Sequence, residues 1–482
     1  MDNANLPSYV APQLRERLGD LSLLWDCWNS LAGVEEQYLP QEPREPAPAY
    51  RGRLQRSVFA PFLREAITGI TGLLSNSTIS DLPATLEAAR EDVDRRGNDL
   101  ETFLAQADAA ALRDGAAPIL VEMPQRMRID SEAQRLTLGA SPYLVLLDRR
   151  NILNWRTEVV AGREQVAQVT IRELRQEPKG QFGTETVTYY RVLVPGAWAL
   201  FRVVGPAGSE RVEQVEAGQT SLAQVPLIWY TPHPAPFGQG DSPFLQLARL
   251  SLQHHTCRSD LIELLHRCAM PVPVRVGAMI SDNGNPPPLV IGPNSVVDVP
   301  EGGAFSFAEP AGGSLAIQQQ NLSHIEQLIA QQSLRFLQSG DAGRTATEAA
   351  LNSSQTTATL TLLVAQKESL FEQLVALWCA YTGEDPTTAS LEIDPSVLQT
   401  PLTAADVAQL ANLYNSKLLS RQSVLERLRS GGILPADFDV EAEMATLDAE
   451  EQQAMAQMLT QQSTAITNAP TFDYGGGPAL NA

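Results

Sequence analysis

The chain has 482 residues, a hydrophobic fraction of 43% and a formal net charge of −21. That length exceeds what one hydrophobic core supports, so we expect roughly two to four domains. The acidic excess argues against a protein that grips nucleic acid through a basic surface, although an acidic wall would let a duplex slide past it. There is no apolar run of about 18 residues to predict a membrane span, and MDNANLPSYV lacks the basic and apolar regions of a signal peptide.

Three helices are predicted in the N-terminal part, over residues 12–39, 53–75 and 99–113, with a proline-rich break between the first two. Asp99 is a suitable N-cap for the third helix, Gly115 a suitable stop, and a strand is expected directly after it, over residues 118–123. A basic cluster starts the second helix, where a solvated helix end is favoured over a phosphate site. Its members are Arg51, Arg53 and Arg56.

Residues 141–231 change to a β texture. Short β-branched or aromatic runs stand between glycine and proline turns, which is typical of strands. These runs are YLVLLD, QVTIREL, TVTYYRVLV, AWALFRVV and PLIWYT. Helices followed by strands predict an α+β class that is mostly helical over the whole chain.

Two long helices are predicted next, over residues 242–268 and 314–338, each about 35–40 Å long. Residues 269–313 between them are rich in proline and glycine, with strands expected over 272–276, 289–291, 295–299 and 304–308 and an exposed loop over 281–288. A small sheet at the end of a helical pair has open edges that another subunit or a partner must cover.

The polar face of the second long helix carries seven glutamines but only two charged residues, Glu326 and Arg335. One interpretation is a solvated helix face. The other is a wall along which a charged polymer passes, because few cations leave few fixed phosphate contacts.

A glycine-containing loop over residues 339–344 precedes a capping box formed by Thr345 and Glu348. The long helix that follows, to about Tyr381, begins with a Ser/Thr-rich stretch of weak helix propensity, so we expect a kink or a mobile segment there. SLEIDP then predicts a strand. Helices are expected over 403–418 and 421–429, where few basic residues favour a packing hairpin over a DNA-reading helix-turn-helix. An acidic stretch, a Gln/Met-rich helix and a disordered tail from about residue 468 complete the chain.

Residues that would carry catalysis or bind a metal are not evident. We find neither a phosphate-binding glycine loop nor a nucleophile motif. The four cysteines are scattered, which favours reduced thiols, and His254, His255 and His266 lack metal-ligand spacing, which favours polar helix positions. We therefore expect no enzyme activity and no cofactor.

The order of several sequence pieces resembles the portal proteins of tailed bacteriophages, over residues 50–451. The pieces are GAAPILVEMP, PYLVLLDRRNILNWR, VPLIWY before SPFLQLARLSLQHH, PVPVRVG, IGPNSVVDVPEGG, and GRTATEAALNSS leading into LFEQLVALW. Their order and spacing, rather than any single piece, carry the resemblance.

The resemblance implies a wing (1–241), a stem of two helices (242–268 and 314–338), a β clip (269–313), a tunnel loop (339–344), a long kinked helix returning to the wing (345–399) and a helical crown (400–467), before the tail (468–482). It also implies a ring, usually of about twelve subunits, at one capsid vertex of the virion. Double-stranded DNA would pass through the ring during packaging and ejection without sequence-specific contacts.

Partners implied by the resemblance are further copies of the chain, the large terminase, a head–tail adaptor, the major capsid protein and a scaffold protein, without membrane contact. Assembly would take place in the host cytoplasm. The candidate channel-lining residues are Gln318, Gln319, Gln327, Gln331, Gln338, Ser339, Asp341 and Arg344, and the candidate partner-binding residues of the clip are Arg275, Ser281, Asp282, Asn283, Asn285 and Pro287. For Arg344, a weak phosphate contact and a salt bridge to Glu348 are both open.

A non-portal structural ring protein of the phage neck, either an adaptor or a scaffold-like protein, is the alternative. Such proteins usually lack the long paired stem and the inserted clip, so residues 242–340 separate the two hypotheses.

Overall fold

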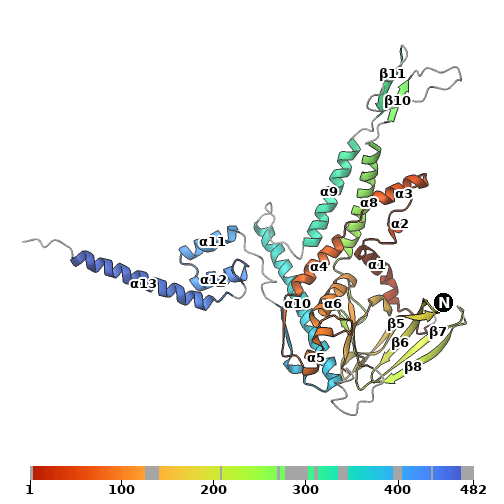
Figure 1. Cartoon of the computed structure of the whole chain (residues 1–482), viewed down its shortest axis with the longest axis horizontal. Coiled ribbons are helices and arrows are strands. Elements are labelled where there is room, and N and C mark those ends of the chain that lie inside the picture. Colours follow the sequence, from red (N-terminus) through yellow and green to blue (C-terminus); the bar gives the residue numbers. More distant parts are fainter. Residues whose placement is uncertain are drawn as a thin grey trace, which may run out of the picture. The chain divides into compact units, whose positions relative to one another are not determined.

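The structure is a computed structural model that describes residues 4–124, 141–206, 209–268, 272–276, 302–308, 313–334, 346–393, 404–435 and 438–467. It is an α+β protein, mostly helical, as the sequence predicts. The chain divides into two compact units, Met1–Asp394 and Pro395–Ala482. Figure 1 shows their elements.

Six α-helices occupy the described residues before the first long strands. They are α1 (Pro12–Trp28), α2 (Glu35–Tyr38), α3 (Ala47–Arg56), α4 (Phe62–Leu74), α5 (Ala84–Ala89) and α6 (Leu100–Asp114). The single helix expected over 12–39 is instead two helices, α1 and α2, because Ser30, Leu31 and Gly33 take positive φ angles that end α1. The expected helix over 53–75 is also two helices, separated by residues 57–61. Pro61 lacks the N–H that a continuous helix would need.

Helix α6 begins and ends as predicted. The Asp99 side chain accepts a hydrogen bond from the backbone N–H of Thr102 at 2.6 Å. Gly115 takes the left-handed conformation, with φ +75°, and a Cβ there would lie 2.5 Å from the backbone carbonyl carbon of Asp241. Glycine is therefore required both by the turn and by the close approach of the segment that leads into the first long helix.

The two largest sheets of unit 1 have three and five strands. In the smaller sheet, β2 (Ala117–Glu122) lies between β3 (Tyr143–Leu146) and β9 (Leu227–Tyr230). The larger sheet is an antiparallel meander of β4 (Ile152–Val160), β5 (Arg163–Lys179), β6 (Gly183–Val194), β7 (Ala197–Val204) and β8 (Arg211–Gln219). The five predicted runs are strands. Strands β4 and β8 were not predicted, because both are rich in polar side chains exposed to solvent.

A common apolar core joins the two sheets. It includes Leu120 of β2 and Leu227 of β9, packed with side chains of the meander such as Val169, Leu193 and Trp198. A separate pair joins β1 (Ser77–Ser80) to β12 (Ser390–Ile393) in antiparallel register, so the strand predicted from SLEIDP is confirmed. This pairing brings residues beyond the last long helix of the unit back to its N-terminal part.

The long helices are α8 (Leu245–Cys268), α9 (Gly313–Leu334) and α10 (Ala346–Thr382). Helix α8 begins three residues later than predicted, because the Ser242 hydroxyl donates to the Leu112 carbonyl at 2.8 Å and accepts from the Phe244 N–H at 3.1 Å. Helix α10 is assigned without interruption over its 37 residues, and a kink within it stays a prediction. The strands predicted over 272–276 and 304–308 are confirmed as β10 (Val272–Val276) and β11 (Ala304–Ala308), which pair with each other.

Unit 2 contains three helices in its described residues, α11 (Ala404–Asn415), α12 (Arg421–Ser430) and α13 (Val440–Thr467). The two helices predicted there are confirmed, and the acidic and Gln/Met-rich stretches form the single helix α13. The Ser420 hydroxyl caps α12 by accepting from the Ser423 N–H at 3.1 Å. The tail from residue 468, the strands expected over 289–291 and 295–299, and the capping residues Thr345 and Glu348 lie outside the described residues or side chains.

Candidate functional site: the α8–α9 hairpin and its base

Helices α8 and α9 lie side by side as an antiparallel hairpin (Figure 1). Their 24 and 22 residues correspond to lengths of about 36 Å and 33 Å. Leu261 of α8 and Ile325 and Ile329 of α9 are buried. The two isoleucines lie one helical turn apart on α9, so one face of that helix is buried.

Polar contacts fix the register of the two helices. The His254 Nε2 atom lies 3.2 Å from Glu326 Oε1, and the Asn321 amide donates to the Cys257 sulfur at 3.7 Å. Moving forward along α8 from His254 to Cys257 moves the contact backward along α9 from Glu326 to Asn321, as expected for an antiparallel pair. The hairpin is therefore held by contacts at two levels along its length.

The histidine pair, expected at polar helix positions rather than in a metal site, lies on a buried face of α8. His254 and His255 are buried, and their rings pack edge-on against Phe62 and Phe59, with centroids 5.2 Å and 5.6 Å apart. Burial lowers the pKa of His255. The periodicity of α8 could not reveal this, because the covering phenylalanines lie about 190 residues earlier in the chain.

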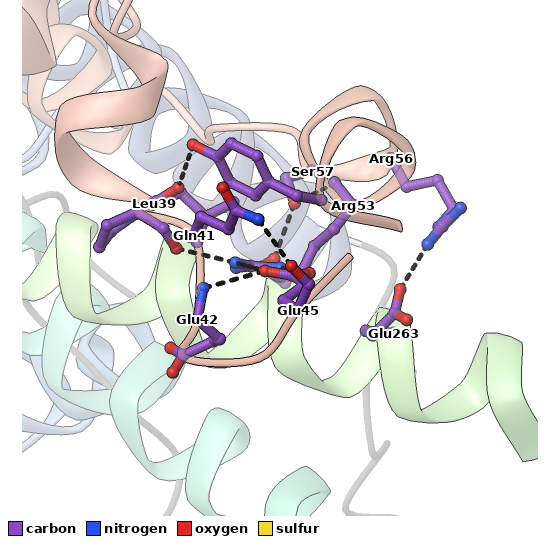
Figure 2. Close-up of polar contacts among 11 residues, drawn as sticks. Leu39, Gln41, Glu42, Glu45, Arg53, Arg56, Ser57 and Glu263 are labelled. Atoms are coloured by element: carbon purple, nitrogen blue, oxygen red, sulfur yellow. Dashed lines mark hydrogen bonds and ion pairs between the residues drawn. The ribbon is translucent and has the colours of Figure 1, made fainter. Parts of the chain in front are cut away.

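Arg53 is neither a solvated helix end nor a phosphate site, which corrects both interpretations of the basic cluster for this residue. Its guanidinium donates to both Glu45 oxygens at 2.9 Å and to the Pro40 carbonyl at 2.8 Å (Figure 2). Both side chains of the pair are only 6% exposed. The hydrogen bonds to Glu45 raise the pKa of Arg53. This bidentate pair closes the loop between α2 and α3 into a fixed unit.

Two further contacts tie that unit to the middle of α8. The Ser57 hydroxyl donates to the Ser259 hydroxyl at 2.8 Å, and Arg56 forms an ion pair with Glu263 (Figure 2). Glu263 is 15% exposed and Arg56 33% exposed, so this pair is partly shielded from solvent. Together with the phenylalanines on the histidine rings, these contacts attach the middle of α8, over residues 254–263, to the N-terminal helices.

The outer face of α9 carries the candidate lining residues. Gln319, Gln327 and Gln331 are exposed, and Gln318 is half-buried. A shallow hollow of about 460 Å³ on this face is lined by Ala316, Gln319, Gln320, Ser323, His324 and Gln327. Within Gly313–Leu334, Glu326 is the only Asp, Glu, Lys or Arg residue. The side chains of this face can form hydrogen bonds, but almost none of them carries a charge.

The other candidate residues are only partly covered by the structure. Gln338, Ser339, Asp341 and Arg344 lie outside the described residues, as do Ser281, Asp282, Asn283, Asn285 and Pro287. Arg275 lies in β10, opposite Phe305 of β11.

A buried polar cluster anchors α10, the helix after the candidate tunnel loop. Lys367 Nζ lies 2.8 Å from Asp108 Oδ2 of α6 and donates to the Leu74 carbonyl of α4 at 2.8 Å. The Tyr230 hydroxyl of β9 donates to the other Asp108 oxygen at 2.6 Å. Lys367 and Asp108 are 1% and 0% exposed. No local sequence pattern predicts this cluster, since a lone lysine on a helix is normally solvated.

The described residues contain no group of three His, Cys, Asp or Glu side chains placed to hold a metal ion. Across the same part of the chain, no helix is both long and apolar enough to cross a bilayer.

Residues 243–382, from the start of α8 to the end of α10, match a family described as "Domain of unknown function (DUF4055)". No curated protein matches the chain. A chain of the solved structure "Neck of empty GTA particle computed with C6 symmetry" is similar at 13% identity and a TM-score of 0.39, covering 81% of this chain and 94% of that chain. A chain of "Virion of native gene transfer agent (GTA) particle" is similar at 12% identity and a TM-score of 0.36, covering 85% and 99%.

Proposed function

We propose that this chain is the portal-type subunit of a tailed phage or phage-like particle. In that role, copies form a ring through which double-stranded DNA enters and leaves the capsid. One observation supports this most: a long helical hairpin carries an inserted β pair at the turn between its helices and continues into a 37-residue helix anchored in the body of the unit. This is the order of stem, clip and long helix that the sequence resemblance implies.

The side chains of α9 suit a surface along which DNA slides better than a surface that binds DNA tightly. Duplex DNA carries about one phosphate charge per 1.7 Å, and each fixed lysine or arginine along its path would add a contact to break. The described part of α9 offers glutamines and one carboxylate instead. About twelve copies at −21 each would carry a formal charge of roughly −250, which favours repulsion of phosphate over binding.

The attachment of α8 suits a part that transmits load. Contacts from the α3–α4 loop, which includes Phe59, and from Phe62 of α4 hold the middle of α8 against the N-terminal helices. A helix fixed in this way stays aligned when a partner binds at its far end. We propose that the terminase and then an adaptor bind the clip, that unit 2 forms the crown, and that the chain has no catalytic role.

Electron microscopy of the purified full-length protein, with rotational symmetry determined, tests the proposal. We expect rings of about twelve subunits with an axial hole wider than a duplex of ~20 Å. Closed small oligomers without a channel, or an absence of rings at every concentration, would overturn it. Enzyme activity dependent on a divalent metal would overturn the proposed lack of a catalytic role.

The lining assignment has its own test with a matched control. The double variant Gln327→Lys/Gln331→Lys adds two cations per subunit to exposed positions of α9, and Gln246→Lys/Gln253→Lys adds two at exposed positions of α8. We expect rings of the first variant to bind linear duplex DNA with a steep salt dependence, and rings of the control to behave like the unchanged protein. Equal binding by the control would contradict the assignment.

A further inference from the structure

The larger sheet of unit 1 is staggered, and this leaves a free two-stranded arm. Strand β5 pairs with β4 only over residues 163–171, but with β6 over residues 169–179. Strand β6 in turn pairs with β7 only from Tyr190 onward. Residues 172–189 therefore extend beyond both neighbouring strands as a hairpin, which we call the β5–β6 arm. Val187 and Tyr189 at its base still pack in the apolar core of the two sheets, so the part that leaves the body is the tip.

The tip of the arm presents an aromatic side chain to solvent. Phe182 is 93% exposed, more than any other large hydrophobic side chain in the described residues, and Leu174 further down the arm is 59% exposed. Gly180 has φ +71°, and a Cβ on Gly183 would lie 2.8 Å from the Lys179 carbonyl oxygen, so both glycines are needed for this tight turn.

Side chains cross-link the arm along its length. The Gln176 amide donates to the Thr186 hydroxyl at 2.8 Å, and Lys179 pairs with Glu185 at 3.0 Å. A two-stranded hairpin alone is marginally stable in water, so these contacts maintain a structure whose apolar tip is left uncovered by the described residues. An exposed phenylalanine held in this way is typical of a binding element.

A pocket that fits such a side chain lies on the same sheet. It has a volume of about 580 Å³ and is lined by Trp198, Leu193, Met123, Pro226 and Tyr381 among others. Gly218 forms part of its wall, because a Cβ there would lie 2.5 Å from the Trp198 ring nitrogen. The pocket therefore depends on a glycine that lets the indole ring lie across β8.

The arm cannot reach the pocket of its own chain. Strand β6 runs without interruption from Gly183 at the arm tip to Val194, and Leu193 lines the pocket. Eleven residues separate Phe182 from Leu193, which at about 3.3 Å per residue places them roughly 35 Å apart. An extended strand cannot shorten that distance without breaking its hydrogen bonds, so a Phe182 side chain that fills this pocket comes from another molecule.

We infer that Phe182 at the tip of the β5–β6 arm inserts into the Trp198 pocket of a second copy of this chain. Charge favours this occupant, because residues 178–184 carry only Lys179, whereas the charged residues lining the pocket are Glu122, Arg191 and Glu216, with a net charge of −1. The Phe182 side chain, which we call the knob, and the Trp198 pocket are different surfaces of the chain. The contact is therefore heterologous, or head-to-tail, and repeats from copy to copy until a ring closes. The inference rests on the proposed function, which supplies adjacent copies in a ring.

The first test compares two exposed side chains at two hairpins of the sheet. Phe182→Ser removes the knob, and Val159→Ser changes a residue of β4 that is 74% exposed and lies outside the arm. By sedimentation velocity, we expect Phe182→Ser to raise the protein concentration for half-assembly at least about tenfold, since central aromatic anchors dominate interfaces. Val159→Ser should leave it unchanged. Equal effects of the two variants, or no effect of Phe182→Ser, would overturn the inference.

The second test traps the contact by oxidation. In the double variant Gln181→Cys/Ala217→Cys, which keeps Phe182 and changes an exposed residue of the arm tip and an exposed residue of the pocket, we expect a ladder of covalent oligomers on non-reducing gels. A mixture of the two single variants should give dimers only, because each molecule then carries half of the contact. Rings visible by electron microscopy without any ladder would overturn the arm contact and leave the proposed function intact. An absence of both rings and ladder would overturn both.

Discussion

The buried pair of Lys367 and Asp108 should be a principal anchor of α10, and removing one partner tests this. Lys367→Met leaves the Asp108 carboxylate, which is 0% exposed, with only the Tyr230 hydroxyl as a partner. Breaking a buried ion pair in this way costs about 3–5 kcal/mol. Unit 1 spans Met1–Asp394, and an unfolding entropy of about 2.1 cal/mol/K per residue gives about 0.8 kcal/mol/K for it, so Tm should fall by about 4–6 °C.

The loss should depend on pH with a defined sign. Burial raises the pKa of Asp108, while Lys367 and Tyr230 oppose the shift. Without the lysine the folded-state pKa rises further above the unfolded value of about 3.9, so stability is present at low pH and is lost as pH rises through the folded pKa. The variant should therefore be less destabilised at pH 5 than at pH 8, as followed by calorimetry.

A matched double variant separates the cost of an unpaired charge from the loss of packing. Lys367→Met/Asp108→Leu replaces both charged groups with apolar ones, and we expect it to regain most of the lost Tm, apart from about 1 kcal/mol for the Tyr230 hydroxyl. A double variant that is less stable than Lys367→Met, or a single variant with unchanged Tm at pH 8, would refute the reasoning.

Three further changes have defined outcomes. Asp99→Ala removes the N-cap of α6 and should lower the free energy of unfolding by about 1 kcal/mol at pH 7, as measured by urea unfolding. Hydrogen bonding lowers the pKa of Asp99, so this loss should disappear as pH falls through that pKa. A loss that does not depend on pH would contradict the capping role. Gly115→Ala should destabilise by more than 1 kcal/mol, whereas Gly97→Ala, also at positive φ but with open space around a Cβ, should cost less, and the reverse order would be inconsistent with the close approach to Asp241. Burial raises the pKa of the Cys27 thiol to about 12, so a thiol reagent at pH 8 should modify it only after unfolding, and rapid modification of the native protein would disprove its burial.

Much of unit 1 could be predicted where the signal is local. Asp99 and Gly115 bounded α6 correctly, because caps and left-handed turns depend on residues within a few positions. The α+β class, the strands of the meander with apolar runs and the α8–β10–β11–α9 order also followed from periodicity and breaks. Strands β4 and β8 were missed because one face of each is solvated, which weakens the apolar pattern on which the prediction depended.

The sequence alone thus determined most helices and strands, the acidic charge and the nearly uncharged face of α9, because each of these depends on composition or on residues close together in the chain. Only the tertiary structure decided that Arg53 is buried on Glu45, that His254 packs beneath Phe62, and that Lys367 reaches Asp108. The same holds for the free β5–β6 arm, which exists because β4 and β7 stop short of it. Burial and pairing depend on which distant segments meet, and that is fixed by the packing of the whole unit.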